Sequence, residues 1–354
     1  MKKTIVALAA LSLFACKKTE TPSAPGDVMY TSGVYVSNEG VFGSGESTLS
    51  HVNYKNSAVT PTAFLDKNGF TLGDVFQSMT EHNGTMYMVI NQSGLIEMAD
   101  ATTLESKGQI SGISQPRYMV TEGNMGYVSD WADNEVKVID LTSNTVVNSV
   151  KVGEDPENMV IHNGKLYVAN NGGSIWAPAL PDSTVSIIDL NTLTEENRIH
   201  LAHAPQSLQI DANGDLWVLC AGFSDWANPS SDTEGKLFKI DVNTLTKEEF
   251  VFTDLSVHPA RLMINGAKDK LFFTSGLYGG ELYQMNISDN ALPANSFISD
   301  IFYGLGVHPT TNEIYRGYSA AFDQNGHVYR YDANGAMIDS VGAGIGPNGF
   351  YFID

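Results

Sequence analysis

Cysteine and basic residues are the scarce components of this 354-residue sequence. Only two residues are cysteine, and 20 Lys and Arg stand against 40 Asp and Glu, which gives a formal net charge of −20. Because phosphate groups are bound by clustered Lys and Arg, this composition predicts no nucleic-acid partner. So few cysteines also exclude a framework of disulfides. The acidic surface is expected to serve solubility.

Catalytic signatures are missing too. The chain contains no Gly-x-Ser-x-Gly and no His-Glu-x-x-His spacing, which mark serine hydrolases and zinc peptidases. Residues 37–45 are rich in glycine but follow no phosphate-loop pattern. We therefore expect a protein that is not an enzyme and that holds no metal and no cofactor.

The N-terminus has the composition of a lipoprotein signal. A basic start at residues 1–3 precedes an apolar stretch that is too short to span a membrane as a helix. The stretch ends in Leu-Phe-Ala-Cys at residues 13–16, which looks like a lipobox and implies that Cys16 is acylated. We predict a signal peptide over residues 1–15, and a lipidated Cys16 with a flexible tether over residues 16–32. An ordinary signal peptide with a chance cysteine is the alternative. Cys220, left without a disulfide partner, is expected to be a buried, inert thiol.

The rest of the chain repeats one unit, which is clearest over residues 155–201. A polar or proline entry leads to an apolar run, a Gly turn, a second apolar run, a loop, an alternating run ending in Asp and a last run. The entry prolines are spaced by 40, 49 and 54 residues, at Pro116, Pro156, Pro205 and Pro259. A period of about 40–50 residues with four strands per unit is typical of β-propellers. We predict an all-β fold, a seven-bladed β-propeller with four-stranded blades over residues 33–354.

The two ends of the repeat region complement each other. The first unit, from Gly33, lacks an entry strand, whereas residues 346–354 read as an entry strand with no unit after it. Pairing this C-terminal strand with the first blade would close the ring and remove exposed sheet edges. A β-sandwich would explain neither the repeats nor these two ends.

Strand direction assigns each loop to one face of the ring. With the strands of a blade named a to d from the entry strand outward, the b–c loops and the d–a links lie on one face. The c–d turns lie on the other face, and most of them follow an Asp. Because an Asp side chain accepts hydrogen bonds from the backbone of its own turn, we interpret these residues as turn caps. They are Asp100, Asp140, Asp189, Asp241 and Asp332.

The b–c loops carry aromatic residues where a purely structural chain would have polar ones. Two of these loops, 171–182 and 221–235, are long, and long loops without secondary structure are usually functional or disordered. The entry strands add Gln77, Arg117, Glu157, Gln206, Arg261 and Asn348 around the axis. Aromatic walls with a few convergent polar groups suit a large, flat, amphipathic ligand, although aromatic cover over blade edges is the alternative. The predicted ligand-binding residues are Phe42, Gln77, Arg117, Trp131, Trp176, Gln206, Phe223, Trp226, Arg261, Tyr278, Tyr318 and Phe322.

Several segments of the first three units resemble a known family. They are residues 33–45, 73–79, 91–97 and 116–118. With the lipobox, they resemble the propeller lipoproteins of Bacteroidota related to the surface protein that captures vitamin B12 beside its outer-membrane transporter, which are DUF5074-type repeat proteins. The resemblance implies that the protein binds cobalamin on its loop-rich face and passes it to a TonB-dependent transporter. It also implies an outer-membrane lipoprotein at the cell surface. Lys17 and Lys18 stand where an acidic export stretch usually follows the lipidated cysteine, so a periplasmic orientation is the alternative.

Two other function classes stay open. One is an enzyme, such as a propeller lactonase or lyase with a metal in the central channel. It needs inward-facing acids, amides or imidazoles, whereas the entry strands offer chiefly Met79, Met119, Met159, Leu208 and Met263. The acids Glu39, Asp130 and Glu157 are expected near the mouth, but nothing in the sequence pairs them. The other class is a docking scaffold for a transporter that binds no small molecule.

Overall fold

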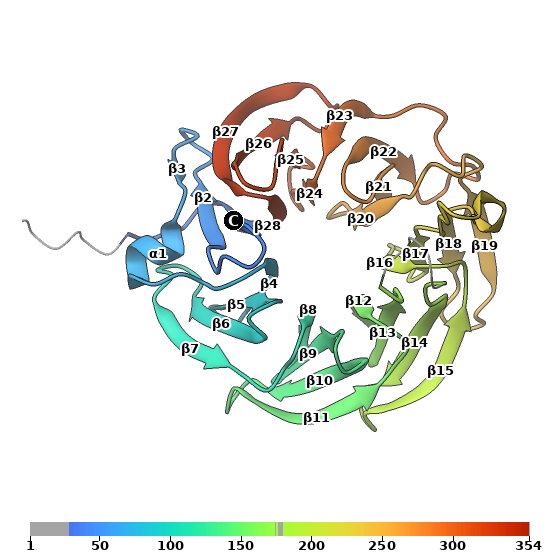
Figure 1. Ribbon diagram of the computed structural model, residues 1–354, viewed down its shortest axis with the longest axis horizontal. Helices are drawn as coiled ribbons and strands as arrows, with labels where there is room; N and C mark the ends of the chain where they lie inside the picture. Colours follow the sequence, from blue (N-terminus) through green and yellow to red (C-terminus); the bar gives the residue numbers. More distant parts are fainter. Residues whose placement is uncertain (1–27, 174, 176–179, 354) are drawn as a thin grey trace, which may run out of the picture.

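Seven four-stranded antiparallel sheets form the fold. The structure, a computed structural model, describes residues 28–173, 175 and 180–353. The innermost strands of the seven sheets surround a common axis (Figure 1). The strands are β1 (Gly33–Asn38), β2 (Thr48–Val52), β3 (Val59–Thr60), β4 (Phe76–His82), β5 (Thr85–Ile90), β6 (Leu95–Asp100), β7 (Ser106–Ile110), β8 (Pro116–Glu122), β9 (Met125–Asp130), β10 (Glu135–Asp140), β11 (Thr145–Lys151), β12 (Pro156–His162), β13 (Lys165–Asn170), β14 (Thr184–Asp189), β15 (Thr194–His200), β16 (Pro205–Ile210), β17 (Leu216–Cys220), β18 (Lys236–Ile240), β19 (Lys247–Val251), β20 (Ala260–Ile264), β21 (Lys270–Thr274), β22 (Gly280–Asn286), β23 (Ile298–Phe302), β24 (Gly304–Val307), β25 (Ile314–Tyr318), β26 (Asn325–Tyr331), β27 (Met337–Ile345) and β28 (Pro347–Ile353).

The predicted seven-bladed propeller is confirmed, including the way in which the ring closes. Blade one has the strand order β28-β1-β2-β3, so the last strand of the chain supplies the innermost strand of the first blade. Strands β1 and β28 pair from Gly33 opposite Ile353 to Asn38 opposite Pro347. Blades two to seven each take four consecutive strands, from β4–β7 to β24–β27. Three innermost strands other than β28 begin at a proline, where the missing N–H interrupts no ladder.

The hydrophobic core is divided among layers between neighbouring blades. One layer combines Tyr87 and Val89 of blade two with Met119 and Val128 of blade three, and similar layers continue around the ring. Each blade therefore buries apolar side chains on both faces, which explains the nearly continuous apolar runs of its second strand. Cys220 is buried and free, and burial raises the pKa of its thiol, as expected for an inert cysteine.

Within the described part of the chain, two short helices lie outside the blades. Helix α1 (Ala63–Asn68) lies at the periphery beside β2 and buries Phe64 (Figure 1). A short 3₁₀ helix at Pro229–Ser231 lies in the long loop of blade five. Before β1, Tyr30 is buried against Tyr35 and His51, so the packed part of the chain begins inside the segment that the sequence assigned to a tether.

The Asp residues before the c–d turns are turn caps, as predicted. The side chain of Asp189 accepts hydrogen bonds from the backbone N–H groups of Asn191 and Thr192, at 2.8 and 2.9 Å. Asp100, Asp140, Asp241 and Asp332 make equivalent bonds. These backbone donors favour the ionised carboxylate and lower the pKa of all five groups.

Candidate functional site

A bulge in the innermost strands presents polar side chains at one end of the ring. In six blades the pairing with the neighbouring strand shifts register directly after the first paired residue, whereas β24 pairs with β25 without a shift. A bulge leaves an extra residue unpaired and redirects its side chain. The residues that follow the first pair are Gln77, Arg117, Glu157, Gln206, Arg261 and Asn348.

Five of these six residues, all but Asn348, line a cavity of about 450 Å³. The b–c loops contribute the aromatic residues Phe42, Trp131, Tyr278 and Phe322 to the same cavity. The structure thus brings together eight of the twelve predicted residues: Phe42, Gln77, Arg117, Trp131, Gln206, Arg261, Tyr278 and Phe322. The volume falls in the range of small-molecule sites.

Three of the other four predicted residues, Phe223, Trp226 and Tyr318, do not line the cavity. Trp176 lies outside the described residues. Phe223 is buried and packs against His203. Trp226 is 79% exposed and does not line the cavity. Tyr318 packs against Tyr329 and the guanidinium of Arg316. The directions of the Phe223 and Tyr318 side chains depend on contacts with residues outside their own loops, such as His203 and Tyr329, and loop membership does not reveal those contacts.

Arg117 is the centre of a polar cluster on the floor of the cavity. Its Nη2 donates to Glu157 Oε1 at 2.7 Å and its Nη1 donates to Gln77 Oε1 at 2.5 Å. Its guanidinium also stacks on the Trp131 ring at 3.8 Å. Burial alone would lower the pKa of Arg117, but the Glu157 carboxylate holds the pKa above its usual value. Burial raises the pKa of Glu157, an effect that Arg117 opposes. Arg117 therefore links blades two, three and four through their bulged residues.

A second cluster forms where blade one meets blade seven. The Tyr303 hydroxyl donates to Glu39 Oε2 at 2.7 Å, and Asn348 Nδ2 donates to Glu39 Oε1 at 2.8 Å. Asn348 Nδ2 also donates to the carbonyl groups of Phe76 and Gln77 in blade two. Burial and the neighbouring Glu39 carboxylate raise the pKa of Tyr303, so this hydroxyl stays protonated as a donor. Both oxygens of Glu39 are thus engaged by neutral donors.

Arg261 differs from Arg117 although both occupy the bulge position. Its guanidinium lies 5.0 Å from the centre of the Tyr303 ring. Its Nε is buried and has no hydrogen-bond partner among the described residues. Its backbone has a φ of 58°, a conformation that is uncommon for residues other than glycine. The cavity therefore contains one arginine whose Nε donates to a carboxylate, Arg117, and one whose Nε has no acceptor among the described residues, Arg261.

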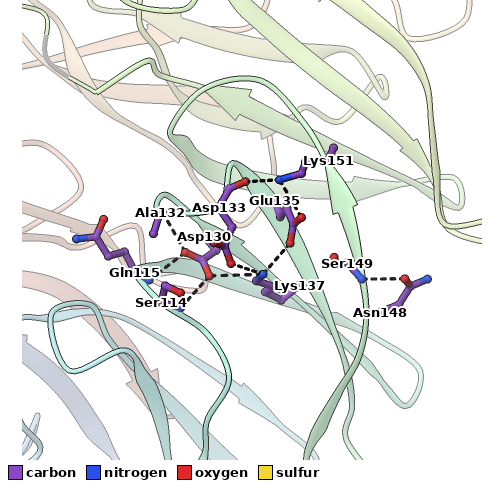
Figure 2. A network of polar contacts seen from close by, with 10 residues as sticks. All are labelled: Ser114, Gln115, Asp130, Ala132, Asp133, Glu135, Lys137, Asn148, Ser149 and Lys151. Atoms are coloured by element: carbon purple, nitrogen blue, oxygen red, sulfur yellow. Dashed lines mark hydrogen bonds and ion pairs between the residues drawn. The ribbon is translucent and has the colours of Figure 1, made fainter.

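A partly buried ion network supports the loop that carries Trp131. Figure 2 shows Asp130 accepting the backbone N–H groups of Ser114 and Gln115, each at 2.9 Å. Lys137 joins Asp133 and Glu135 at 2.5 and 2.7 Å, and hydrogen bonds from Lys137 lower the pKa of Glu135 to about 2 (Figure 2). Asp130 was expected near the mouth as an acid, but it is fully buried and caps the link between blades two and three.

The sequence missed several residues at the cavity. Tyr303 and Tyr118 line it beside the arginines. The available signal was position in the repeat, since Tyr118 lies in the entry strand β8, as Gln77 does in β4, and Tyr303 directly precedes the entry strand β24. Glu39 and Glu157 were expected near the mouth with nothing in the sequence to pair them, whereas the structure gives both of them partners. The expectation that entry-strand apolar residues face the channel is wrong for Met119, Met159 and Leu208. These three side chains are buried in layers between blades, where apolar neighbours cover them.

The described residues lack two further classes of feature. They contain no group of three or more His, Cys, Asp or Glu side chains placed to hold a metal ion. In the same part of the chain, every helix falls short of the length and apolar character that a membrane span requires.

Known structures share the architecture at low sequence identity. A quinonprotein alcohol dehydrogenase-like protein from Bacteroides thetaiotaomicron is 17% identical, with a TM-score of 0.70 over 92% of this chain and 79% of that one. A protein from Bacteroides uniformis, solved as a candidate 6-phosphogluconolactonase, is 11% identical, with a TM-score of 0.62 over 92% of this chain and all of that one. The computationally designed protein Ika8 is 10% identical, with a TM-score of 0.60 and 92% of each chain covered. At these identities the likeness establishes the propeller fold alone.

Sequence comparison supplies the family. A search of curated proteins gave no match. The family model DUF5074, described as a domain of unknown function, matches residues 32–352. This match begins one residue before β1, ends one residue before the end of β28 and so spans all seven blades. The chain therefore belongs to the DUF5074 family.

Proposed function

We propose that the protein is a non-catalytic capture protein, which holds a large, flat, amphipathic ligand over the cavity and passes it to an outer-membrane transporter. The observation that carries the proposal is the rim of exposed aromatic side chains. Phe42 is 73% exposed, Tyr278 69% and Phe322 49%, and all three line the cavity. Exposed aromatics gathered around a hollow with a polar floor are typical of ligand sites.

The ligand class follows from the shape and the chemistry of the site. Cobalamin, the ligand implied by the sequence resemblance, is our first candidate, since its corrin is planar, apolar on its faces and fringed with amides. A corrin is larger than a cavity of about 450 Å³, so it would lie across the rim with one edge inside. Gln77 and Gln206 offer amide groups at the floor.

The absence of catalysis is part of the proposal. Glu39 and Glu157 are the acidic residues that line the cavity. Glu157 is held by Arg117, and both oxygens of Glu39 accept hydrogen bonds. Neither carboxylate is thus free to act as a general base without breaking a contact. Attachment through Cys16 to the outer membrane, with delivery to a TonB-dependent transporter, completes the proposed role.

Titration of the purified protein with cyanocobalamin tests the proposal, with calorimetric heat and tryptophan fluorescence followed together. We expect saturable one-to-one binding. Phe42→Ala and Tyr278→Ala should each weaken binding by ~1–3 kcal/mol if these side chains form the wall. Trp226→Ala is the matched control, because this exposed aromatic does not line the cavity. The absence of any heat from a folded protein would remove cobalamin as the ligand, and equal losses in all three variants would place the site elsewhere.

A further inference from the structure

The two arginines at the cavity provide an internal comparison. Arg117 has a carboxylate, an amide and an aromatic ring as partners. Arg261 has the Tyr303 ring, and among the described residues its Nε has no acceptor. A buried guanidinium N–H without an acceptor destabilises the folded state, because it has lost its hydrogen bond to water and has formed no hydrogen bond within the protein.

The carboxylates at the cavity are already engaged. Glu157 contacts Arg117, and Glu39 accepts from Tyr303 and Asn348. Neither forms an ion pair with Arg261 among the described residues. Among the described residues that line the cavity, none therefore forms a charge-matched hydrogen bond with Arg261.

The backbone of Arg261 points to the same conclusion. The bulges of blades two, four and five place the positive φ on the residue before the first pair, at Val75, Asp155 and Ala204. In blade six the positive φ of 58° lies on the arginine itself. Strain of this kind persists where the surrounding structure holds a side chain in a required direction, and it clusters at ligand sites.

We propose that Arg261 is the anchor for an acidic group of the ligand, so that the cavity selects molecules that combine a flat apolar body with a carboxylate, sulfonate or phosphate at one edge. This inference rests on the proposed function, because it uses the same cavity. The planar guanidinium matches the two oxygens of such a group, and Phe42, Tyr278 and Phe322 contact the apolar body.

Two dyes that differ by one acidic group test the proposal. 8-Anilinonaphthalene-1-sulfonate and N-phenyl-1-naphthylamine share the same ring system, and only the first carries a sulfonate. We expect the wild-type protein to bind the sulfonate dye roughly tenfold or more tightly than the neutral dye, as a charge-assisted hydrogen bond implies. Arg261→Gln should remove that preference by weakening the sulfonate dye far more than the neutral dye, and Arg261→Lys should restore part of it.

The control is Arg198→Gln, which removes a surface arginine that pairs with Glu195 on β15. Circular dichroism and the melting temperature establish that each variant is folded. A sulfonate preference that survives in Arg261→Gln, or no preference in the wild type, would overturn the anchor role while leaving the cyanocobalamin result to decide the proposed function. Failure of both dyes and of cyanocobalamin to bind the wild type would overturn both.

Discussion

Replacing Glu157 with Gln should destabilise the propeller through the arginine that it leaves behind. The pair is mostly out of water, with side-chain exposures of 15% for Arg117 and 11% for Glu157. Removing one partner of a buried ion pair costs about 3–5 kcal/mol, because the remaining charge is left uncompensated. Arg117 keeps its bonds to Gln77 and its contact with Trp131, and the cavity admits water, so we expect a loss near ~3 kcal/mol in the free energy of unfolding.

Equilibrium unfolding in urea measures this loss as a lower midpoint at an unchanged slope. The double variant Arg117→Gln with Glu157→Gln should lose clearly less free energy of unfolding than the two single variants lose together, because removing both charges leaves no unpaired charge. Glu249→Gln is the matched control, since Glu249 pairs with Lys236 at 3.1 Å but is 54% exposed. It should change stability by less than ~1 kcal/mol. A loss for Glu157→Gln no larger than that of the control, or strict additivity in the double variant, would refute the reasoning.

Two further predictions concern ring closure and acid stability. Gly317→Ala should destabilise the fold by ~1–3 kcal/mol, as overpacking does, because the new Cβ would overlap the Pro347 carbonyl oxygen of β28. Gly342→Ala is the control and should be nearly neutral in thermal unfolding, since the space around its Cβ is open. Equal effects of the two substitutions would argue against this close approach of β28 to β25. Hydrogen bonds with Lys137 lower the pKa of Glu135 to about 2. The ionised carboxylate therefore stabilises the folded state at pH values above its unfolded pKa, near 4.3. This stabilisation disappears as the pH falls toward 2. Wild-type stability should therefore fall more steeply than that of Glu135→Gln between pH 5 and 2, and parallel curves would contradict this assignment.

The repeat pattern was sufficient to predict the fold because each blade is a local unit. The entry prolines, the Gly turns and the Asp caps each specify a strand end, and Asp189 shows that the predicted cap forms as expected. Ring closure was predictable for the same reason, since the strand Pro347–Ile353 had no unit of its own to complete.

The site was predictable only in part, because side-chain direction depends on contacts between distant residues. Arg117 and Arg261 follow the same kind of entry in the sequence. Yet Arg117 meets a carboxylate 40 residues away and Arg261 meets a ring. Phe223 and Phe42 are both loop aromatics, but Phe223 is buried and Phe42 is exposed. The residues that flank Arg117, Arg261, Phe223 and Phe42 in the sequence do not reveal these differences in contact and burial.

The direction of β1 gives the ring a polarity with respect to its leading segment. This strand ends at Asn38, directly before the loop that brings Glu39 and Phe42 to the cavity. The start of β1, at Gly33, lies roughly 20 Å from its end at Asn38, because the strand has six residues in extended conformation. Ahead of it, the Tyr30 N–H donates to the Thr102 carbonyl in a c–d turn, on the opposite face. The described chain therefore enters the ring on the face opposite the aromatic rim. If Cys16 carries a lipid, as we propose, the anchor is attached from that opposite face, and the aromatic rim is the face that is left for incoming ligand.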